Sequence, residues 1–136
     1  MEKLLETGVG IASNPVPKAD KPELSAGAGS LPDGLYMAAV AWVNGAGEEG
    51  APGECAALLL PPASALVVTA VNAPANARGW NVYVGVAEDA LFRQNVEPVA
   101  IGQAWAQSEA PVAGRRPGNG QRPSWMRATA RVLQRG

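Results

Sequence analysis

Three glutamates near the middle of the sequence are the residues best placed to do chemistry. Glu48, Glu49 and Glu54 lie within a stretch of seven residues that follows a glycine-rich turn. Clustered carboxylates can bind calcium through their oxygens or work as a general acid and base. The stretch lacks the spacing of an EF-hand and a recognisable second ligand group. We therefore interpret it as an acidic, exposed hairpin loop.

The composition removes the commonest catalytic designs. The 136 residues include no histidine, whereas catalytic triads, most zinc sites and much general acid-base catalysis use imidazole. The single cysteine, Cys55, has no second cysteine to pair with and no adjacent basic residue that would activate its thiol. We predict that Cys55 is part of the core and that the protein is not an enzyme, with no cofactor and no metal.

Two short glycine motifs match phosphate-binding loops only in part. Gly8-Val-Gly10 lacks the preceding strand and the third glycine of a dinucleotide-binding loop. Gly45-Ala-Gly47 leads into acidic residues, where a phosphate would need basic ones. We interpret both motifs as turns.

The tryptophans are candidates for binding sugars or partner proteins. Trp80 and Trp105 could form an aromatic platform for a sugar, but both lie in apolar, strand-like patterns that favour packing in the core. Trp125 follows Pro123 in an arginine-rich segment. A large apolar side chain among arginines is typical of an interface anchor.

Charge is divided unevenly along the chain. Residues 1–114 carry all twelve acidic residues and five basic ones, whereas residues 115–136 carry six arginines and no acid. Guanidinium groups pair well with carboxylates at interfaces, so we predict that this end binds an acidic surface of a neighbouring subunit. Phosphate binding and a tail that folds back onto its own acidic domain are the alternatives, and the acidic body disfavours nucleic acid. The predicted partner-binding residues are Arg115, Arg116, Arg122, Trp125, Arg127, Arg131 and Arg135.

The elements that must position these residues are predicted to be strands. Sixteen glycines and twelve prolines are too many for a helical protein, because both residues interrupt helices. The start of the chain lacks the apolar run of a secretory signal, and no segment has about eighteen consecutive apolar residues. We expect a soluble, all-β protein made in the cytoplasm.

Alternating polarity and turn residues indicate where the strands lie. Residues 35–44 are apolar on both faces, which predicts a central strand, and residues 55–60 are a possible hairpin partner. The final residues, 124–136, fit a strand or a short helix, and we favour a strand or extended chain. The remaining predicted strands are residues 22–25, 65–71, 79–85, 91–94 and 97–107, the last interrupted near Gly102.

Several of these motifs resemble the fibronectin type III-like repeats of bacterial and tailed-phage proteins. They are Leu31-Pro-Asp-Gly-Leu-Tyr36 with the strand that follows it to Asn44, Gly47-Glu-Glu-Gly-Ala-Pro52, Gly79-Trp-Asn-Val-Tyr-Val-Gly85, Phe92-Arg-Gln94 and Pro98-Val-Ala-Ile-Gly102. The resemblance spans about residues 22–112 and is strongest to repeats of virion structural proteins. It implies no catalytic residues, and it implies that the Tyr36 hydroxyl bonds to nearby backbone. The chain departs from the usual pattern in carrying the Leu-Pro element early, so the strand order is left open.

These observations predict a fibronectin type III-like β-sandwich over residues 22–112, with an extended N-terminal arm over residues 1–21 and a basic C-terminal arm over residues 113–136. The resemblance implies a non-catalytic structural component of a tailed-phage particle, as a capsid decoration, neck or tail accessory protein. Such a protein is located in the virion and binds other virion proteins and copies of itself, with no membrane. The alternative is a carbohydrate-binding or adhesive module, host-facing or from a secreted bacterial protein.

Overall fold

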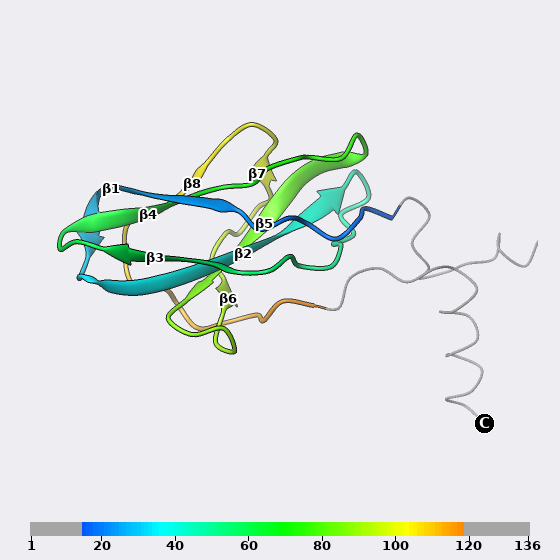
Figure 1. The fold of residues 1–136 in the computed structure, drawn as a ribbon. Coiled ribbons are helices and arrows are strands. Elements are labelled where there is room, and N and C mark those ends of the chain that lie inside the picture. Colours follow the sequence, from blue (N-terminus) through cyan, green and yellow to red (C-terminus); the bar gives the residue numbers. More distant parts are fainter. Residues whose placement is uncertain (1–14, 119–136) are drawn as a thin grey trace, which may run out of the picture.

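Two antiparallel sheets form the described part of the protein, residues 15–118 of a computed structural model (Figure 1). The first sheet has the order β1 (Glu23–Leu31), β4 (Ser64–Thr69) and β8 (Trp105–Gln107). The second has the order β3 (Ala56–Leu60), β2 (Gly34–Asn44), β5 (Ala77–Gly85) and β6 (Phe92–Arg93), with β7 (Val99–Ala100) also paired to β5. The predicted all-β, sandwich-like class is confirmed. Residues 15–118 include no helix that is long and apolar enough to cross a membrane.

β2 is the central strand of the second sheet. It pairs with β3 on one side and with β5 on the other, as its apolar sequence predicts. Side chains alternate between the two faces of a strand, so Val40 and Trp42 point into the space between the sheets while Ala39 and Ala41 point outward. All four are buried. The prediction of a strand covered on both faces is confirmed.

The main core lies between the two sheets. Trp42 and Trp80 are cross-strand partners on β2 and β5, and both are buried there. The first sheet covers them with Leu66 and Val68 of β4 and with Leu31 at the end of β1. Trp80 is 1% exposed, which confirms its prediction as a core residue. Burying large aromatic side chains of this kind is the main stabilising term of such a small sandwich.

The predicted strand over residues 97–107 is two strands that belong to different sheets. β7 pairs with β5 in the second sheet, whereas β8 pairs with β4 in the first. The chain turns between them at Gly102, whose φ of 87° favours glycine. The predicted interruption is confirmed, and it is the place where the chain crosses from one sheet to the other.

The first strand is longer than the predicted residues 22–25, because β1 pairs with β4 from Glu23 to Leu31. Small residues let the backbones of β1 and β4 approach each other closely. A Cβ placed on Gly29 would lie 2.7 Å from the Ser64 carbonyl oxygen and 2.8 Å from the Ala65 Cβ. Gly29 therefore allows β1 to continue as far as the turn that leads into β2.

Tyr36 closes the turn between β1 and β2. Its buried side chain donates a hydrogen bond from the hydroxyl to the Pro32 carbonyl oxygen at 2.9 Å. This is the bond to nearby backbone that the resemblance implies, and that expectation is confirmed. The bond ties the start of β2 to Pro32, the residue that follows β1.

We expect Tyr36→Phe to lower the free energy of unfolding by about 1 kcal/mol, because it leaves the ring in place and removes one hydrogen bond. Urea denaturation measures this. Val96→Ala is the control, since Val96 is 87% exposed and its truncation should change stability by less than about 0.5 kcal/mol. Equal stability of Tyr36→Phe and the wild type would show that the bond contributes nothing.

Candidate functional site

The outer face of the second sheet carries polar side chains that are nevertheless buried. Asn81 and Tyr83 of β5 point away from the main core and lie opposite Ala41 and Ala39 of β2. Tyr83 packs with both alanines and with Leu91 in a second, smaller buried cluster. Since neither face of β5 is open to water at these positions, the polar groups of Asn81 and Tyr83 need protein partners.

Glu49 provides that partner. One carboxylate oxygen, Oε2, accepts hydrogen bonds from the Tyr83 hydroxyl and from Asn81 Nδ2, the latter at 2.8 Å. These are charge-assisted hydrogen bonds, which are stronger than bonds between neutral groups. The three side chains come from two segments that lie more than thirty residues apart in the sequence, and they form a polar cluster that we call the Glu49 network.

The backbone after β2 explains why Glu49 lies over the sheet. The chain turns at Asn44, whose Oδ1 accepts hydrogen bonds from the amides of Ala46 and Glu48. It then runs back along β2, with the Gly50 amide donating to the Trp42 carbonyl at 2.8 Å and the Gly53 amide to the Val40 carbonyl at 3.1 Å. The segment therefore stays beside β2 and does not project into solvent.

This course corrects our interpretation of residues 48–54 as an exposed acidic loop. Glu48 and Glu49 are half-buried, and Glu54 alone of the three glutamates is exposed. Glu48 accepts a hydrogen bond from Asn44 Nδ2 at 2.9 Å, so the carboxylates point to different partners. Within the described residues, no group of three or more acidic, cysteine or histidine side chains is arranged to hold a metal ion.

The Glu49 network continues into the loop after β6 through Asn95. Asn95 Nδ2 donates to Asn81 Oδ1 and to the Glu97 carbonyl, both at 2.9 Å, and Asn95 Oδ1 accepts from the Val82 amide at 2.9 Å. Both asparagines are buried. Each thus exchanges the hydrogen bonds it would make with water for bonds within the protein, which is the arrangement of a structural network.

The environment of Tyr83 raises the pKa of its hydroxyl above the ordinary value. Burial is the largest cause, followed by the hydrogen bond to Glu49 and the negative charge of that carboxylate. The positive charges of Arg115 and Arg93 act in the opposite direction. Tyr83 is therefore held as a neutral hydrogen-bond donor, which is unsuited to act as a base.

Cys55 lies at the rim of the same buried cluster, half-buried and next to Glu88. Its Sγ is 3.7 Å from the Glu88 Oε2. Burial and the adjacent carboxylate both raise the pKa of the thiol, so Cys55 is not an activated nucleophile. The predicted core position is correct in part, because the side chain packs against the cluster while one side remains accessible.

The chain after β8 returns along the second sheet and brings two of the predicted arginines onto the body. The side chain of Gln94 makes two hydrogen bonds to the backbone of Val112. Gln94 Oε1 accepts from the Val112 amide at 3.0 Å, and Gln94 Nε2 donates to the Val112 carbonyl at 2.9 Å. The Arg93 amide donates to the Arg115 carbonyl at 2.8 Å. The Arg116 guanidinium donates to the Asp89 carbonyl and lies 5.9 Å from the centre of the Phe92 ring. Residues 112–116 are thus bound to the domain that precedes them.

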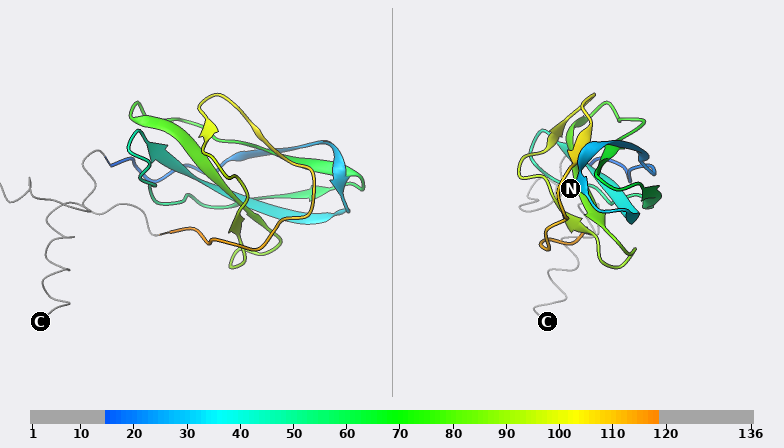
Figure 2. Two further views of the ribbon diagram at one scale, coloured as in Figure 1. Left: turned by 180° about the vertical axis from the view of Figure 1, so that it is seen from behind. Right: turned by 90° about the vertical axis from the view of Figure 1, so that its left-hand side faces the viewer.

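The predicted partner-binding set is only partly within the described residues. Arg115 and Arg116 are exposed beside β6, and their role in binding a partner stays a prediction. The other five lie outside the described residues: Arg122, Trp125, Arg127, Arg131 and Arg135. The described chain enters at residue 15 and leaves at residue 118 from the same end of the sandwich, as Figure 2 shows.

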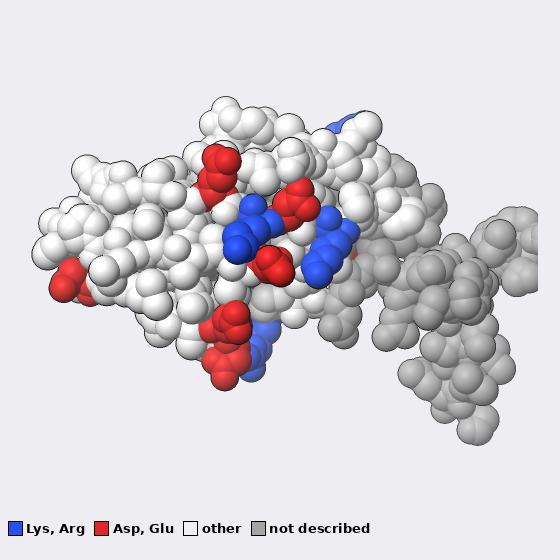
Figure 3. Space-filling model, viewed as in Figure 1, with Lys and Arg blue, Asp and Glu red and all other residues white. Residues whose placement is uncertain are grey.

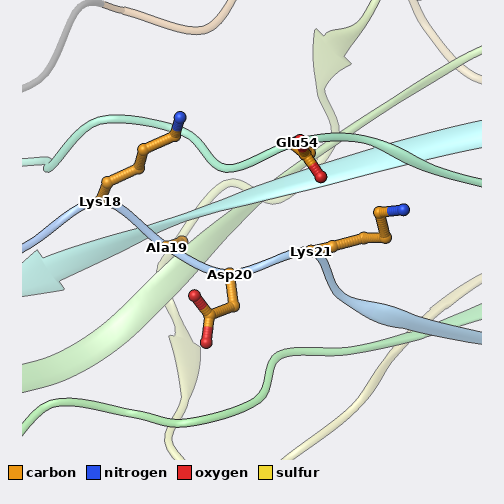
Figure 4. A pocket seen from close by; sticks show the side chains of 5 residues that line it. All are labelled: Lys18, Ala19, Asp20, Lys21 and Glu54. Atoms are coloured by element: carbon orange, nitrogen blue, oxygen red, sulfur yellow. The ribbon is translucent and has the colours of Figure 1, made fainter.

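A hollow of about 310 Å³ lies on the surface between residues 18–21 and Glu54. Acidic and basic side chains gather in the middle of this face (Figure 3), and the hollow is lined by Lys18, Ala19, Asp20, Lys21 and Glu54. The four ionisable side chains do not converge on one point (Figure 4). Asp20 accepts a hydrogen bond from Asn72 Nδ2 at 2.7 Å. The hollow is therefore a gap between two exposed segments and lacks the convergent groups of a ligand site.

Comparisons of this chain with protein-family models, with curated proteins and with solved structures gave no match. The functional argument therefore depends on the residues and on their geometry. The polar cluster that the structure assembles is structural, and the signal for it in the sequence is a pair of polar residues, Asn81 and Tyr83, on one face of a strand in a mostly apolar pattern.

We expect Glu49→Ala to lower the free energy of unfolding by about 1–3 kcal/mol, because it leaves two buried donors without an acceptor. Denaturation of Glu49→Ala, Tyr83→Phe and the double variant measures the coupling, which should be at least about 0.5 kcal/mol. Glu54→Ala removes an exposed glutamate of the same segment and is the matched control. Strictly additive effects of the two substitutions would contradict a shared network.

The raised pKa of Tyr83 predicts a loss of stability in alkali. In the unfolded chain the hydroxyl titrates near the ordinary value of 10.0, while in the folded protein it keeps its proton to higher pH. Its contribution is thus complete below about pH 10 and is lost as pH rises through the folded pKa. Above about pH 10, the wild type should lose stability more steeply than Tyr83→Phe as pH rises. Parallel curves for the two proteins would refute this.

Proposed function

We propose that this chain is a non-catalytic structural component of a tailed-phage particle, with a fibronectin type III-like body that binds neighbouring virion subunits through its terminal arms. The proposal is carried by two observations taken together. The two ends of the described body lie at the same end of the sandwich, and the C-terminal segment has a charge opposite to that of the body, since residues 119–136 hold four arginines and no acid.

The charge balance supports binding between chains. Residues 15–118 contain ten acidic and six basic residues, so the body is anionic while the segment that follows it is cationic. A guanidinium forms paired hydrogen bonds with a carboxylate, which makes arginine suited to protein interfaces. The acidic surface of a second copy, or of another virion protein, has the charge that this segment requires.

The interior chemistry of the body supports a structural role. The polar side chains over the second sheet bond to one another, as the Glu49 network shows, and Tyr83 is held neutral. The thiol of Cys55 has a raised pKa. These groups stabilise the fold, and none of them is poised to transfer a proton or to act as a nucleophile. A rigid body with binding segments at one end is what an assembly subunit requires.

The shared exit gives the proposal its geometry. When both termini leave one end of an elongated sandwich, contacts through them place that end against the particle and direct the opposite end outward. Each predicted arm contains two prolines, Pro15 and Pro17 in residues 1–21 and Pro117 and Pro123 in residues 113–136, and these reduce the conformational entropy lost on docking. This arrangement suits a decoration, neck or tail accessory protein.

The carbohydrate-binding alternative has less support from the described residues. An aromatic platform needs an exposed ring, and Trp80 is inside the main core. Trp105 is half-buried against that core, and its indole nitrogen donates to Gln107 Oε1 at 2.9 Å. Neither tryptophan is presented as a flat, open surface for a sugar.

We expect a chain that ends at Gly118 to fold with an unchanged unfolding midpoint and to be incorporated into particles at least about tenfold less than the full chain, because the cationic contacts are lost. Phage that lack this chain, supplied with either form during infection, provide the assay. Quantitative mass spectrometry of purified particles measures incorporation.

A full-length variant with four substitutions separates charge from length. It carries Arg122→Gln, Arg127→Gln, Arg131→Gln and Arg135→Gln, and it should be depleted from particles to a similar degree as the truncated chain. Arg78→Gln, at an exposed arginine of the body, is the matched control and should be incorporated normally. Normal incorporation of the truncated chain would refute the proposal.

A further inference from the structure

The two sheets leave four edges, and three of them are protected against pairing with another chain. β6, β7 and β8 are only two or three residues long, and the segment at Arg115 bonds to β6. β1 begins with the charged Glu23, and its pairing with β4 shifts register between Ala28 and Leu31. Short strands, charges and irregular register are the features by which proteins prevent edge-to-edge association.

The edge formed by β3 has none of these protections. Its five residues, Ala56–Leu60, include no charge and no proline, and they pair with β2 in one unbroken register. In an edge strand, alternate backbone N–H and C=O groups point away from the sheet and are free to bond to a further strand. Within residues 15–118, β3 therefore presents a regular and unprotected template.

The surface next to β3 is apolar and carries little charge. Leu59 is 72% exposed, and its cross-strand partner on β2, Leu35, is 47% exposed. Residues 55–77, which include β3 and β4, contain no charged residue. Figure 3 shows that the part of this face over β3 and β4, at the left, is almost free of charge, in contrast to the middle of the face.

We propose that β3 is a self-association site, at which a second copy of this chain pairs its own β3 in antiparallel orientation about a twofold axis. An antiparallel edge is complementary to its own copy, so the five-stranded sheet would continue into the second molecule. Leu59 and Leu35 of both copies then cover one another along the junction. Two identical surfaces that carry little charge meet with little repulsion, although the body as a whole is anionic.

The size of this edge indicates a weak contact. A strand of five residues and two leucines is well below the roughly 800 Å² that each partner buries in a stable interface. The pairing should therefore depend on concentration, and it would be favoured where other contacts hold many copies close together. It does not depend on the terminal arms, since β3 lies outside both of them.

Sedimentation velocity of the full chain, over about 10 μM to 1 mM, tests the proposal. The wild type should show a reversible monomer–dimer equilibrium, and Leu59→Lys should raise its dissociation constant at least about tenfold, because it places a charge at the centre of the junction. Leu35→Lys should act in the same direction. Val96→Lys changes an 87% exposed valine in a loop away from β3 and should leave the constant within about twofold.

Hydrogen exchange locates the contact on the backbone. The outward-facing amides of Ala56–Leu60 should exchange more slowly at high protein concentration than at low concentration, and this difference should be lost in Leu59→Lys. A wild type that remains monomeric throughout the range, or a dimer that is equally stable in Leu59→Lys, would overturn the proposal. A chain that ends at Gly118 should still dimerise. Incorporation into particles therefore tests the role of the arms, and dimerisation in solution tests the role of β3, independently of each other.

Discussion

Burial of β2 on both faces is the constraint on which the rest of the structure depends. One face, with Val40 and Trp42, is covered by the first sheet, and the other, with Ala39 and Ala41, is covered by Tyr83 and by connecting segments. A strand without a solvent face needs two separate covers, because each exposed apolar side chain would lose the free energy of burial. The sandwich supplies one cover, and the chain around residues 48–55 with the loop after β5 supplies the other.

The segments that cover the outer face of the second sheet determine which polar side chains are buried there. Closing the outer face traps Asn81 and Tyr83, and a buried donor without an acceptor costs more than the bond it could have made. Glu49 removes that cost through its hydrogen bonds to both residues. Of the three glutamates in residues 48–54, Glu49 is therefore used to close the outer face of the second sheet.

The two surfaces that we propose bind partners differ in physical character. Next to the shared exit of the two ends, charge is the main feature, with an anionic body followed by a cationic segment. Along β3 the surface is apolar and offers backbone hydrogen bonds. Charged contacts select complementary partners over a distance, whereas an open strand edge selects another strand at close range. A subunit with both kinds of surface can be held by its ends and make lateral contacts along its side.

The sequence by itself determined the local features of this protein. A run that is apolar on both faces located β2, and period-two alternation located β5. Proline and glycine marked strand ends, Gly102 marked the break before β8, and the resemblance at the motif that ends in Tyr36 implied its bond to the backbone. Only the tertiary structure decided that β7 and β8 belong to different sheets, that the half-buried Glu49 bonds to Tyr83, and that Arg116 lies on Phe92. The reason is physical. Alternation depends on neighbours along the chain, whereas sheet order and the pairing of buried polar groups depend on contacts between residues that are distant in sequence and meet only when the core closes.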